Sequence, residues 1–373
     1  MNYRKMQQFR IPWISNAQLF FVMVIIRNII AISLTSALTS GDAGQDVWIS
    51  TIMSMLLSLV QLWFLIAIHK RLPDCNLTEL CNEIFGKYLG KVLSVIFIVY
   101  FLVLVIGVNA FLGLMHMAVL PETPMEAVQW SFLFVVWYSL YKGLHSTIRS
   151  TGIIFFTIIL NHIALLLFLI PEIDLQEFLP VLYYGWAPVL KGTVLPTALF
   201  LENLFILHIL PMVQKTKWTY RIPYLANITS GTLLLSLAGM LVATFGAKEA
   251  EKLQFPFFSL ARVVSVGNFL ERIEIVVVWV WIASIFIGIT IYLFIAKNMM
   301  EHTFLWLKSY EQYISFVVVV FVALVTPFFF SNINELLRFY SDKQYAVLSY
   351  IVGLMIPVIM YLVMRLRGKG ISP

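Results

Sequence analysis

The sequence predicts an all-α polytopic membrane protein, and three observations predict it. Of the 373 residues, 61% are hydrophobic and only 12% are charged, against about 25% charged residues in soluble domains. The mean hydropathy is +0.90. Apolar stretches recur along the whole chain, and most are long enough for a membrane-spanning helix, which needs about 20 residues to cross about 30 Å of hydrocarbon. We therefore treat residues 1–373 as a single integral membrane domain.

Ten apolar segments are predicted to be transmembrane helices. The fourth is short, and only the sequence YKGLHS separates it from the fifth, so these two helices should form a tight hairpin. The predicted spans, in chain order, are residues 16–39, 47–68, 92–119, 126–141, 147–170, 187–213, 222–245, 274–296, 312–331 and 344–364.

Two further segments are predicted to be helical without crossing the membrane. Leu77–Tyr88 has apolar residues at helical spacing and charges on another face, which indicates a short cytoplasmic helix at the membrane interface. In Phe255–Glu274, Pro256 can begin a helix, and Gly267 and Asn268 can end it. This external segment is either a gate over the bundle or a plain surface helix.

The distribution of charge predicts the orientation of the bundle. Most of the 25 Lys and Arg residues flank one side, together with both termini, whereas the acidic loops fall on the other side. Because loops rich in Lys and Arg stay in the cytoplasm, both termini are predicted to be cytoplasmic. The basic start MNYRKMQQFR resembles the beginning of a signal peptide, but no cleavage site follows, so we assign the apolar stretch to the first span.

Metal, cofactor and enzyme signatures are not found in the sequence. Cys75 and Cys81 lie in a predicted cytoplasmic loop, where a disulfide is not expected. Two thiols at this spacing without a nearby His make a poor zinc site. The chain also contains no H-E-x-x-H, G-x-S-x-G, P-loop or G-x-G-x-x-G pattern. We therefore predict no enzyme activity, no metal and no cofactor.

Two charged residues stand near the middle of predicted spans. Arg27 lies in the first span and Glu202 in the sixth. An ionised side chain at the bilayer centre costs about 2.5–3.5 kcal/mol on insertion scales, so such residues face a protein interior or a watery cavity and mark functional sites. This pair is therefore the main candidate for function in the sequence.

The positions of these charges predict an inverted repeat. Ten spans divide into two sets of five with opposite orientation, so that the first span corresponds to the sixth. Each carries its charge followed by an Asn, as Arg27-Asn28 and Glu202-Asn203. Pro196 removes a backbone donor from the sixth span, and inverted-repeat transporters bind polar ligands at such discontinuous helices. We predict a 5+5 transporter-like fold with discontinuous first and sixth helices. The alternative is two unrelated polar sites held by ordinary interhelical bonds.

The chain resembles a known family over nearly its full length. It is similar to the permease-like (B-type) membrane subunit of bacterial spore germinant receptors, within the amino acid/polyamine/organocation transporter superfamily. The stretches that carry the resemblance are GDAGQDVWIS (Gly41–Ser50), KRLPDCNLTELCNEIFGKYLGK (Lys70–Lys91), FLPVLYYGWAPVLKG (Phe178–Gly192) and FPFFSLARVVSVGNFLERIEIVVVWVWI (Phe255–Ile282).

The resemblance implies a place in the spore inner membrane and a complex with a larger membrane-attached subunit and a lipoprotein subunit. It implies that the protein senses a small nutrient, such as an amino acid, and helps to trigger germination; it gives no role to nucleic acid. By the superfamily's pattern the ligand lies between the first, third, sixth and eighth helices. The ligand-binding residues expected here are Arg27, Asn28, Tyr100, Phe200, Glu202, Asn203, Trp281 and Ser284.

The chain departs from the superfamily in its first helix. Relatives commonly carry Gly and other small residues at the break of that helix, whereas Leu19–Leu38 contains no Gly and places Arg27 near that depth. Three explanations stay open. The helix is less unwound, or Arg27 itself binds an anion through its bidentate fork, or Arg27 pairs with Glu202 and locks two helices together.

Three functions compete at the level of sequence. The first is a germinant-sensing receptor subunit whose ligand biases a gate. The second is a secondary transporter of amino acids or related solutes that alternates access around the same site. The third is a structural membrane subunit in which the two charges only hold helices together.

Overall fold

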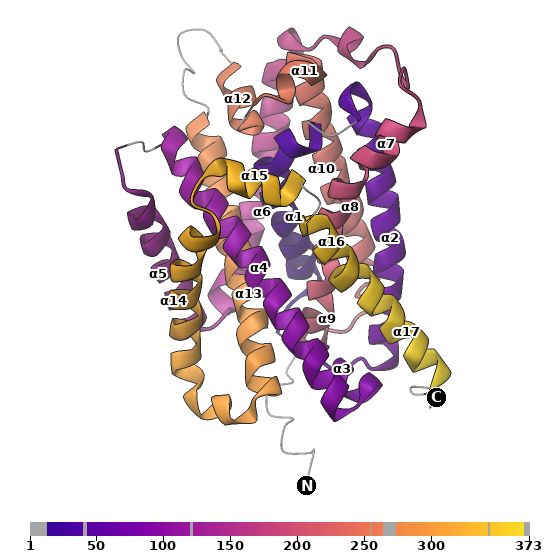
Figure 1. Ribbon diagram of the computed structural model, residues 1–373, viewed down its shortest axis with the longest axis vertical. Coiled ribbons are helices and arrows are strands. Elements are labelled where there is room, and N and C mark those ends of the chain that lie inside the picture. Colours follow the sequence, from indigo (N-terminus) through magenta and orange to yellow (C-terminus); the bar gives the residue numbers. More distant parts are fainter. Residues whose placement is uncertain are drawn as a thin grey trace.

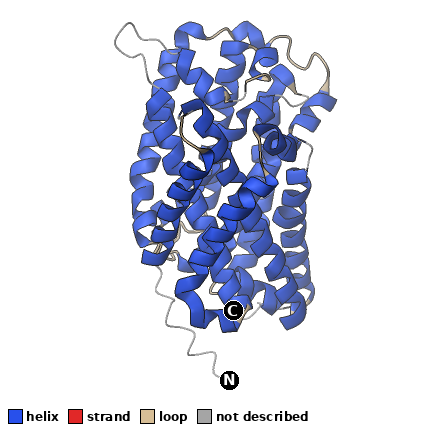
Figure 2. Cartoon of the chain, turned by 60° about the vertical axis from the view of Figure 1, so that its left-hand side comes forward, coloured by secondary structure: helices blue, strands red, loops and turns tan. Residues whose placement is uncertain are grey.

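The computed structural model describes residues 13–39, 43–119, 122–253, 255–263, 274–341 and 344–368. Throughout these ranges the regular elements are helices, and a single parallel bridge pairs Ile14 with Val213. Most helices run along the long axis of one bundle (Figures 1 and 2). Seven helical segments are long and apolar enough to cross a membrane, or up to eight if one bent pair is a single span. The protein is therefore an all-helical integral membrane protein.

Helices occupy all of the segments that were predicted to span the membrane, with ends that differ by a few residues. The sixth and the last segments are each divided into several pieces. The continuous helices are α1 (Asn16–Thr39), α2 (Val47–Arg71), α4 (Lys87–Val119), α5 (Met125–Lys142), α6 (His145–Leu169), α10 (Ile222–Phe245), α13 (Glu274–Thr303) and α14 (Glu311–Phe329). The sixth segment consists of α7 (Trp186–Gly192), α8 (Val194–Phe200), the 3-10 helix η5 (Leu201–Phe205), α9 (Ile206–Ile209) and the 3-10 helix η6 (Leu210–Met212). The last consists of α16 (Gln344–Ser349), the π-helix η9 (Tyr350–Met355) and α17 (Ile356–Leu366).

The predicted discontinuity is present in the sixth helix and absent from the first. The sixth segment changes from α-helix to 3-10 helix at Leu201 and contains Gly192 and Pro196. In contrast, α1 is one α-helix from Asn16 to Thr39, so the prediction of a broken first helix is wrong. The physical reason is that α1 contains neither Gly nor Pro, and every residue can therefore keep its backbone donor and helical conformation.

The predicted cytoplasmic helix forms at one end of the bundle as α3 (Leu77–Phe85). Its first turn is closed by a capping box. The Glu79 N–H donates to Asn76 Oδ1 at 3.0 Å, and the Asn76 N–H donates to Glu79 Oε2 at 2.8 Å. Its apolar face is buried against α4, α13 and α17. Burial raises the pKa of the Cys81 thiol to about 12, so this cysteine stays protonated and unreactive at neutral pH.

The external segment begins as predicted. Helix α12 (Pro256–Val263) starts at Pro256 and buries Phe257 and Leu260 against α1, α10 and α13, so its apolar face lies on the bundle. The predicted end at Gly267 and Asn268 lies outside the described residues.

A short helix that the sequence analysis did not predict crosses the bundle. Helix α15 (Ile333–Ser341) follows α14 and lies nearly perpendicular to the long helices (Figure 1). It contacts α4 and α16 and buries Leu336 and Tyr340. The remaining short elements are η2 (Gly44–Asp46), η3 (Ile170–Glu172), η4 (Leu175–Phe178), α11 (Ala247–Ala250) and η8 (Leu305–Tyr310).

The described chain starts and ends at the same end of the bundle. The N–H groups of Trp13 and Ile14 donate to the Met212 carbonyl at 3.0 and 3.1 Å. At the other terminus, Arg367 Nη1 donates to the Ile84 carbonyl of α3 at 2.7 Å. Figure 1 places α3 and the end of α17 together at the end opposite α11 and α12.

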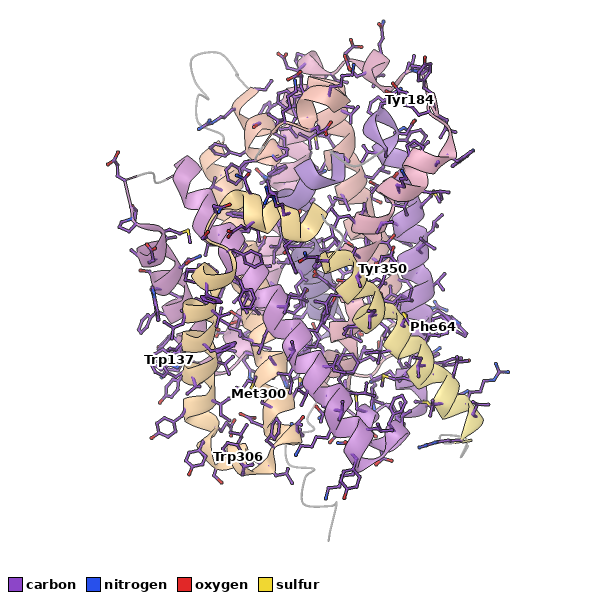
Figure 3. The ribbon with its side chains drawn as sticks, in the orientation of Figure 1. Phe64, Trp137, Tyr184, Met300, Trp306 and Tyr350 are labelled. Atoms are coloured by element: carbon purple, nitrogen blue, oxygen red, sulfur yellow. The ribbon has the colours of Figure 1, made fainter. Side chains whose placement is uncertain are left out.

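Exposed aromatic residues lie at both ends of the bundle. Tyr184 and Trp306 are 74% and 67% exposed and lie at opposite ends of the molecule in Figure 3. Aromatic side chains at these two levels are typical of the two membrane–water interfaces.

The last and sixth helices approach most closely at Gly353. A Cβ atom at this position would lie 2.7 Å from the Leu201 carbonyl oxygen and 2.9 Å from its Cβ. Both distances are far below van der Waals contact, and one of the atoms belongs to backbone. Only glycine therefore allows the π-helix of the last span to lie against the 3-10 helix of the sixth.

We predict that Gly353→Ala destabilises the protein by about 1–3 kcal/mol, the usual cost of overpacking. Thermal unfolding of the purified protein in detergent measures the effect. The matched control is Gly239→Ala in α10, where a new Cβ would have no atom within 4 Å. Equal melting temperatures for the two variants would show that the close approach does not constrain the fold.

Candidate functional site

A stripe of polar residues on α2 faces the sixth helix. Ser50, Ser54, Ser58 and Gln61 follow one another at helical spacing and are fully buried. Three of them donate hydrogen bonds to backbone carbonyls of the sixth segment: Ser50 Oγ to Val189 (2.9 Å), Ser54 Oγ to Thr193 (3.1 Å) and Gln61 Nε2 to Leu201 (2.7 Å). This face of α2 therefore supports the irregular backbone of its neighbour.

The 3-10 helix η5 is held by side chains from other helices. A 3-10 turn forms poorer backbone hydrogen bonds than an α-helix, and in an apolar interior its carbonyls need good donors. The Phe200 carbonyl accepts from Arg27 Nη2 at 3.1 Å. The Leu201 carbonyl accepts from Gln61 Nε2, which also donates to the Gly353 carbonyl at 2.7 Å. Donors from α1 and α2 thus stabilise one irregular turn, and Gln61 also links it to the last helix.

Arg27 reaches this turn from the middle of α1. Its side chain is 2% exposed, and its Nη2 also donates to Asn203 Oδ1 at 2.9 Å. The guanidinium carbon lies 4.6 Å from the centre of the Phe200 ring, within the range of a cation–π contact. The Nε and Nη1 atoms are buried and have no hydrogen-bond partner in the described structure. Nη2 therefore has two partners, and Nε and Nη1 have none among the described residues.

The Glu202 carboxylate binds two tyrosine hydroxyls. Tyr292 of α13 donates to Oε2 at 2.6 Å, and Tyr345 of α16 donates to Oε1. Glu202 and both tyrosines are 1% exposed. Arg27 and Glu202 are close enough to interact electrostatically, but within the described residues no hydrogen bond or ion pair joins them. The third explanation for Arg27, a direct ion pair with Glu202, is therefore not observed in the described structure.

A relay of amides continues from Arg27 across the bundle. Asn203 Nδ2 donates to Asn227 Oδ1 of α10 at 3.0 Å, and Asn227 Nδ2 donates to Ser58 Oγ of α2 at 2.8 Å. These bonds connect α1, the sixth segment, α10 and α2 through buried groups. A displacement of Arg27 or Asn203 would therefore affect the contacts of several helices.

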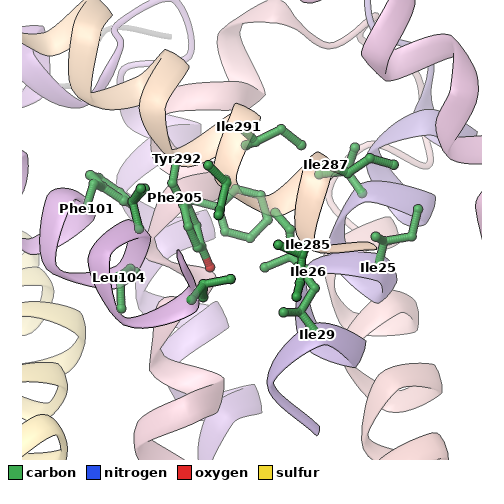
Figure 4. Close-up of a cluster of buried hydrophobic side chains, with 14 of the residues drawn as sticks. Ile25, Ile26, Ile29, Phe101, Leu104, Phe205, Ile285, Ile287, Ile291 and Tyr292 are labelled. Atoms are coloured by element: carbon green, nitrogen blue, oxygen red, sulfur yellow. The ribbon is translucent and has the colours of Figure 1, made fainter. Parts of the chain in front are cut away.

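An apolar shell surrounds these polar groups. Figure 4 shows the Tyr292 side chain among isoleucines of α1 and α13 and the side chains of Phe101 and Leu104 from α4. The drawn residues of this shell are at most 3% exposed. Because a water-poor surrounding strengthens electrostatic interactions and hydrogen bonds, the guanidinium and carboxylate groups act on their partners more strongly here than at a surface.

Five of the predicted ligand-binding residues lie in or beside this cluster. Arg27, Phe200 and Asn203 are joined by the contacts above, and Glu202 precedes Asn203 in the same 3-10 turn. Tyr100 is buried on α4 and lies within electrostatic reach of Glu202, with its hydroxyl 3.4 Å from Ser349 Oγ.

Asn28, Trp281 and Ser284 are buried but make none of the described hydrogen bonds to Arg27 or Glu202. Asn28 Nδ2 has no hydrogen-bond partner in the described structure. Ser284 Oγ donates to the Val280 carbonyl of its own helix at 2.7 Å. The Trp281 ring lies 6.1 Å from that of Phe111.

The structure adds residues that the sequence analysis missed. One of them is Tyr292 of α13, which bonds Glu202. Tyr292 lies about 12 Å beyond the predicted Ser284 along α13, at 1.5 Å per residue. Tyr345 was missed because the last helix was not among the four helices expected around the ligand. In contrast, the buried stripe on α2 could have been found, since its polar residues recur at helical spacing in an otherwise apolar span.

The fold and the site define a membrane protein of transporter architecture, in which a broken helix carries a buried carboxylate. Solved structures support this class. The chain is similar to a manganese transporter of Eremococcus coleocola in complex with an aromatic bis-isothiourea substituted compound, with a TM-score of 0.54, 13% identity and coverage of 94% of this chain and 85% of the other. A mutant of that transporter gives a TM-score of 0.57 at 12% identity, covering 92% and 78%. At such low sequence identity, the similarity to these structures is evidence about the fold alone.

The chain belongs to the spore germination protein family, whose model matches residues 13–336. It is 25% identical to spore germination protein XB of Bacillus anthracis over 285 residues, which are 75% of this chain and 78% of the relative. It is also 25% identical to spore germination protein A2 of Bacillus subtilis over 349 residues, 91% of each chain. The protein is therefore a germination-related membrane protein, and its family and structural neighbours are transporters and germination proteins rather than enzymes.

The metal named for the structural neighbours finds no matching ligand set in the described residues. No group of three or more His, Cys, Asp or Glu side chains that could hold a metal ion occurs among them. The oxygens of Glu202 bind tyrosine hydroxyls instead.

We predict that Glu202 and Tyr345 are energetically coupled. In a double-mutant cycle, Glu202→Gln and Tyr345→Phe should deviate from additivity by about 0.5–3 kcal/mol, as groups in direct contact do. Denaturant or thermal unfolding in detergent measures the four proteins. The control cycle combines Glu202→Gln with Tyr313→Phe, a tyrosine that is 67% exposed, and should be additive within about 0.5 kcal/mol. Additivity in both cycles would contradict the bond.

Proposed function

We propose that this protein is the membrane subunit of a nutrient germinant receptor. It binds a small germinant, an amino acid or a similar solute, near the bilayer midplane and helps to trigger spore germination. The observation that carries this proposal is that Nε and Nη1 of Arg27 are buried beside the irregular sixth helix without a described partner. Family membership supports the role in germination, and the buried site supports the binding of a ligand.

The free donors of Arg27 favour a ligand that carries a carboxylate. Both Glu202 oxygens already accept hydroxyl bonds, whereas Nε and Nη1 of Arg27 have no partner in the described residues. A buried donor without a partner costs about 1–3 kcal/mol, and more when it is charged. A carboxylate binds an arginine in a bidentate way through Nη2 together with Nε or Nη1, so a ligand would use one free donor and share Nη2, which already bonds Phe200 and Asn203. Among the explanations for Arg27, we therefore favour direct binding of an anion.

Ligand binding at Arg27 would also change the contacts of the sixth helix. The same guanidinium group holds the Phe200 carbonyl and Asn203, and Asn203 continues to Asn227 and Ser58. A ligand that draws Arg27 toward its carboxylate competes with these bonds. The receptor then has two arrangements, one with Arg27 bonded to the sixth helix and one with Arg27 bonded to the ligand. A ligand that binds the second arrangement more tightly shifts the population of the receptor toward it, and a sensor requires such a shift.

The proposed architecture has ten membrane spans in a 5+5 inverted repeat, as one domain. The coincidence of all ten predicted segments with helices supports it, and the shared end of the described termini is consistent with an even number of crossings. By the distribution of Lys and Arg, that shared end is cytoplasmic. We further propose that the protein lies in the spore inner membrane and assembles with a larger membrane-attached subunit and a lipoprotein subunit, as the family resemblance implies.

The second candidate is a secondary transporter of amino acids or related solutes. The likeness of the fold to a solved transporter favours it. A structural subunit, in which the buried cluster only holds helices together, is the third. The three candidates differ in whether the site binds a solute and whether that solute crosses the membrane.

Spores that carry Arg27→Gln at the native locus should germinate at least about tenfold more slowly on a mixture of amino acids, because a bidentate charge-assisted contact is lost. The loss of optical density measures germination, and immunoblotting verifies equal protein levels. The matched control is Arg149→Gln, which removes an exposed arginine of α6. Germination of Arg27→Gln spores at the control rate, with normal protein levels, would overturn the role of Arg27.

A transport assay separates the sensor from the transporter. For a sensor, proteoliposomes with the wild-type protein should take up labelled amino acids no faster than empty vesicles, although the same amino acids protect a cysteine introduced near Phe200 from alkylation. Uptake that Arg27→Gln abolishes would assign transport. If the amino acids are not taken up and do not protect the cysteine, the protein would be a structural subunit.

A further inference from the structure

A second site lies at the end of α2 and the start of α10 that we assign to the cytoplasm. It follows the buried cluster along both helices, since Trp63 and Tyr224 lie within one turn of Gln61 and Asn227. It is a pocket of about 340 Å³, in the size range of small-ligand sites. The end of α2 and the start of α10, with the turn before it, form its walls. The lining residues are Trp63, Ile66, Ala67, Lys70, Lys217, Tyr220, Arg221 and Tyr224.

Three cations lie in this pocket without a carboxylate. Lys70, Lys217 and Arg221 make no ion pair with any described residue, and no acidic residue lines the pocket. Asp74, on the loop after α2, is paired instead with Lys215 at 2.6 Å. Three like charges around one cavity repel one another, and an anion bound between them would remove that repulsion.

Each of these exposed cations lies over an aromatic ring, Lys70 over Tyr220 of the lining and the other two over Trp218, which does not line the pocket. Lys70 Nζ lies 5.1 Å from the centre of the Tyr220 ring, and Arg221 Cζ lies 5.3 Å from the Trp218 ring. Lys217 Nζ lies over the same indole at 5.9 Å. Cation–π contacts of this length fix the direction of a long side chain without neutralising its charge. The hydroxyls of Tyr220 and Tyr224 add two further donors on the wall.

Exposed apolar side chains of α2 and α10 continue from the pocket along both helices. Above it, α2 exposes Leu56, Val60 and Trp63 to about half of their area, and α10 exposes Leu225 and Ile228 to a similar extent. Helix α2 lies at the edge of the bundle in Figure 1. A ligand with a charged head in the pocket would therefore have an apolar path for its tail along both helices.

We propose that this pocket holds the phosphate headgroup of an anionic phospholipid. Lys70, Lys217 and Arg221 bind the phosphate oxygens, and the acyl chains follow the exposed apolar faces of α2 and α10. Basic pockets between helices at the cytoplasmic side are suited to such headgroups. Free phosphate offers the same oxygens to the three cations, but it would not contact the apolar faces of α2 and α10. The experiment therefore compares a phospholipid with inorganic phosphate.

The test uses the full-length protein in a neutral detergent and follows its melting temperature during titration. The three probes are dioleoyl phosphatidylglycerol, dioleoyl phosphatidylcholine and inorganic phosphate. Phosphatidylglycerol should stabilise the wild type saturably, with an apparent affinity at least about tenfold higher than phosphatidylcholine, and inorganic phosphate should give no shift in the same range. The combined change of Lys70→Gln, Lys217→Gln and Arg221→Gln should remove the preference for the anionic lipid.

The matched control removes three exposed cations that do not line this pocket. Lys142→Gln, Arg149→Gln and Lys308→Gln together cause the same change of net charge, and this variant should keep the wild-type preference. If the pocket variant does not fold, Arg221→Gln alone should weaken the phosphatidylglycerol effect at least about threefold while Arg149→Gln does not. Equal losses in the pocket and control variants would overturn the site. Equal protection by phosphatidylcholine or by inorganic phosphate would overturn the lipid assignment.

Discussion

The sixth helix contains an irregular turn in the apolar interior, and its neighbours are arranged to satisfy that turn. A polar backbone in hydrocarbon must find donors within the protein. The Phe200 and Leu201 carbonyls receive theirs from Arg27 on α1 and Gln61 on α2. Gly353 lets the last helix approach closely enough for Gln61 to bond both backbones. The positions of α1, α2 and the last helix therefore depend on a single turn.

The same turn separates the two buried charges. Glu202 points to Tyr292 and Tyr345, whereas the neighbouring Asn203 and Phe200 contact Arg27. The carboxylate is thereby satisfied by neutral donors, and the guanidinium group keeps donors that no described acceptor uses. A direct ion pair would have consumed both charges in mutual contact. Their separation leaves the cation available to a ligand while the carboxylate fixes α13 and α16 against the sixth helix.

Much of the fold follows from local signals in the sequence, and the missing parts depend on long-range packing. Apolar length predicts where the spans lie, and Pro196 predicts an irregular sixth helix. The crossing helix α15 carries a local signal, since Asn332 caps it and Leu336 and Tyr340 share one face, but it is too short for a span, and its place across the bundle depends on packing. Tyr292 and Tyr345 could not be assigned to Glu202, since the depth of a residue within its own span does not determine which helix it faces. Arg27 was identified because a charge in hydrocarbon is costly whatever surrounds it.

The unbroken first helix changes how an anion can be recognised in this fold. A discontinuous helix offers backbone N–H groups and the positive end of its dipole to a carboxylate. Helix α1 keeps those groups within its own hydrogen bonds, and in the proposed receptor Arg27 would supply the donors from a side chain instead. A side chain can move between partners without unwinding its helix. In the proposed receptor, exchange of the Phe200 and Asn203 contacts for a ligand carboxylate thus requires only rotation of the Arg27 side chain, and the amide relay to α10 and α2 carries the change into the bundle.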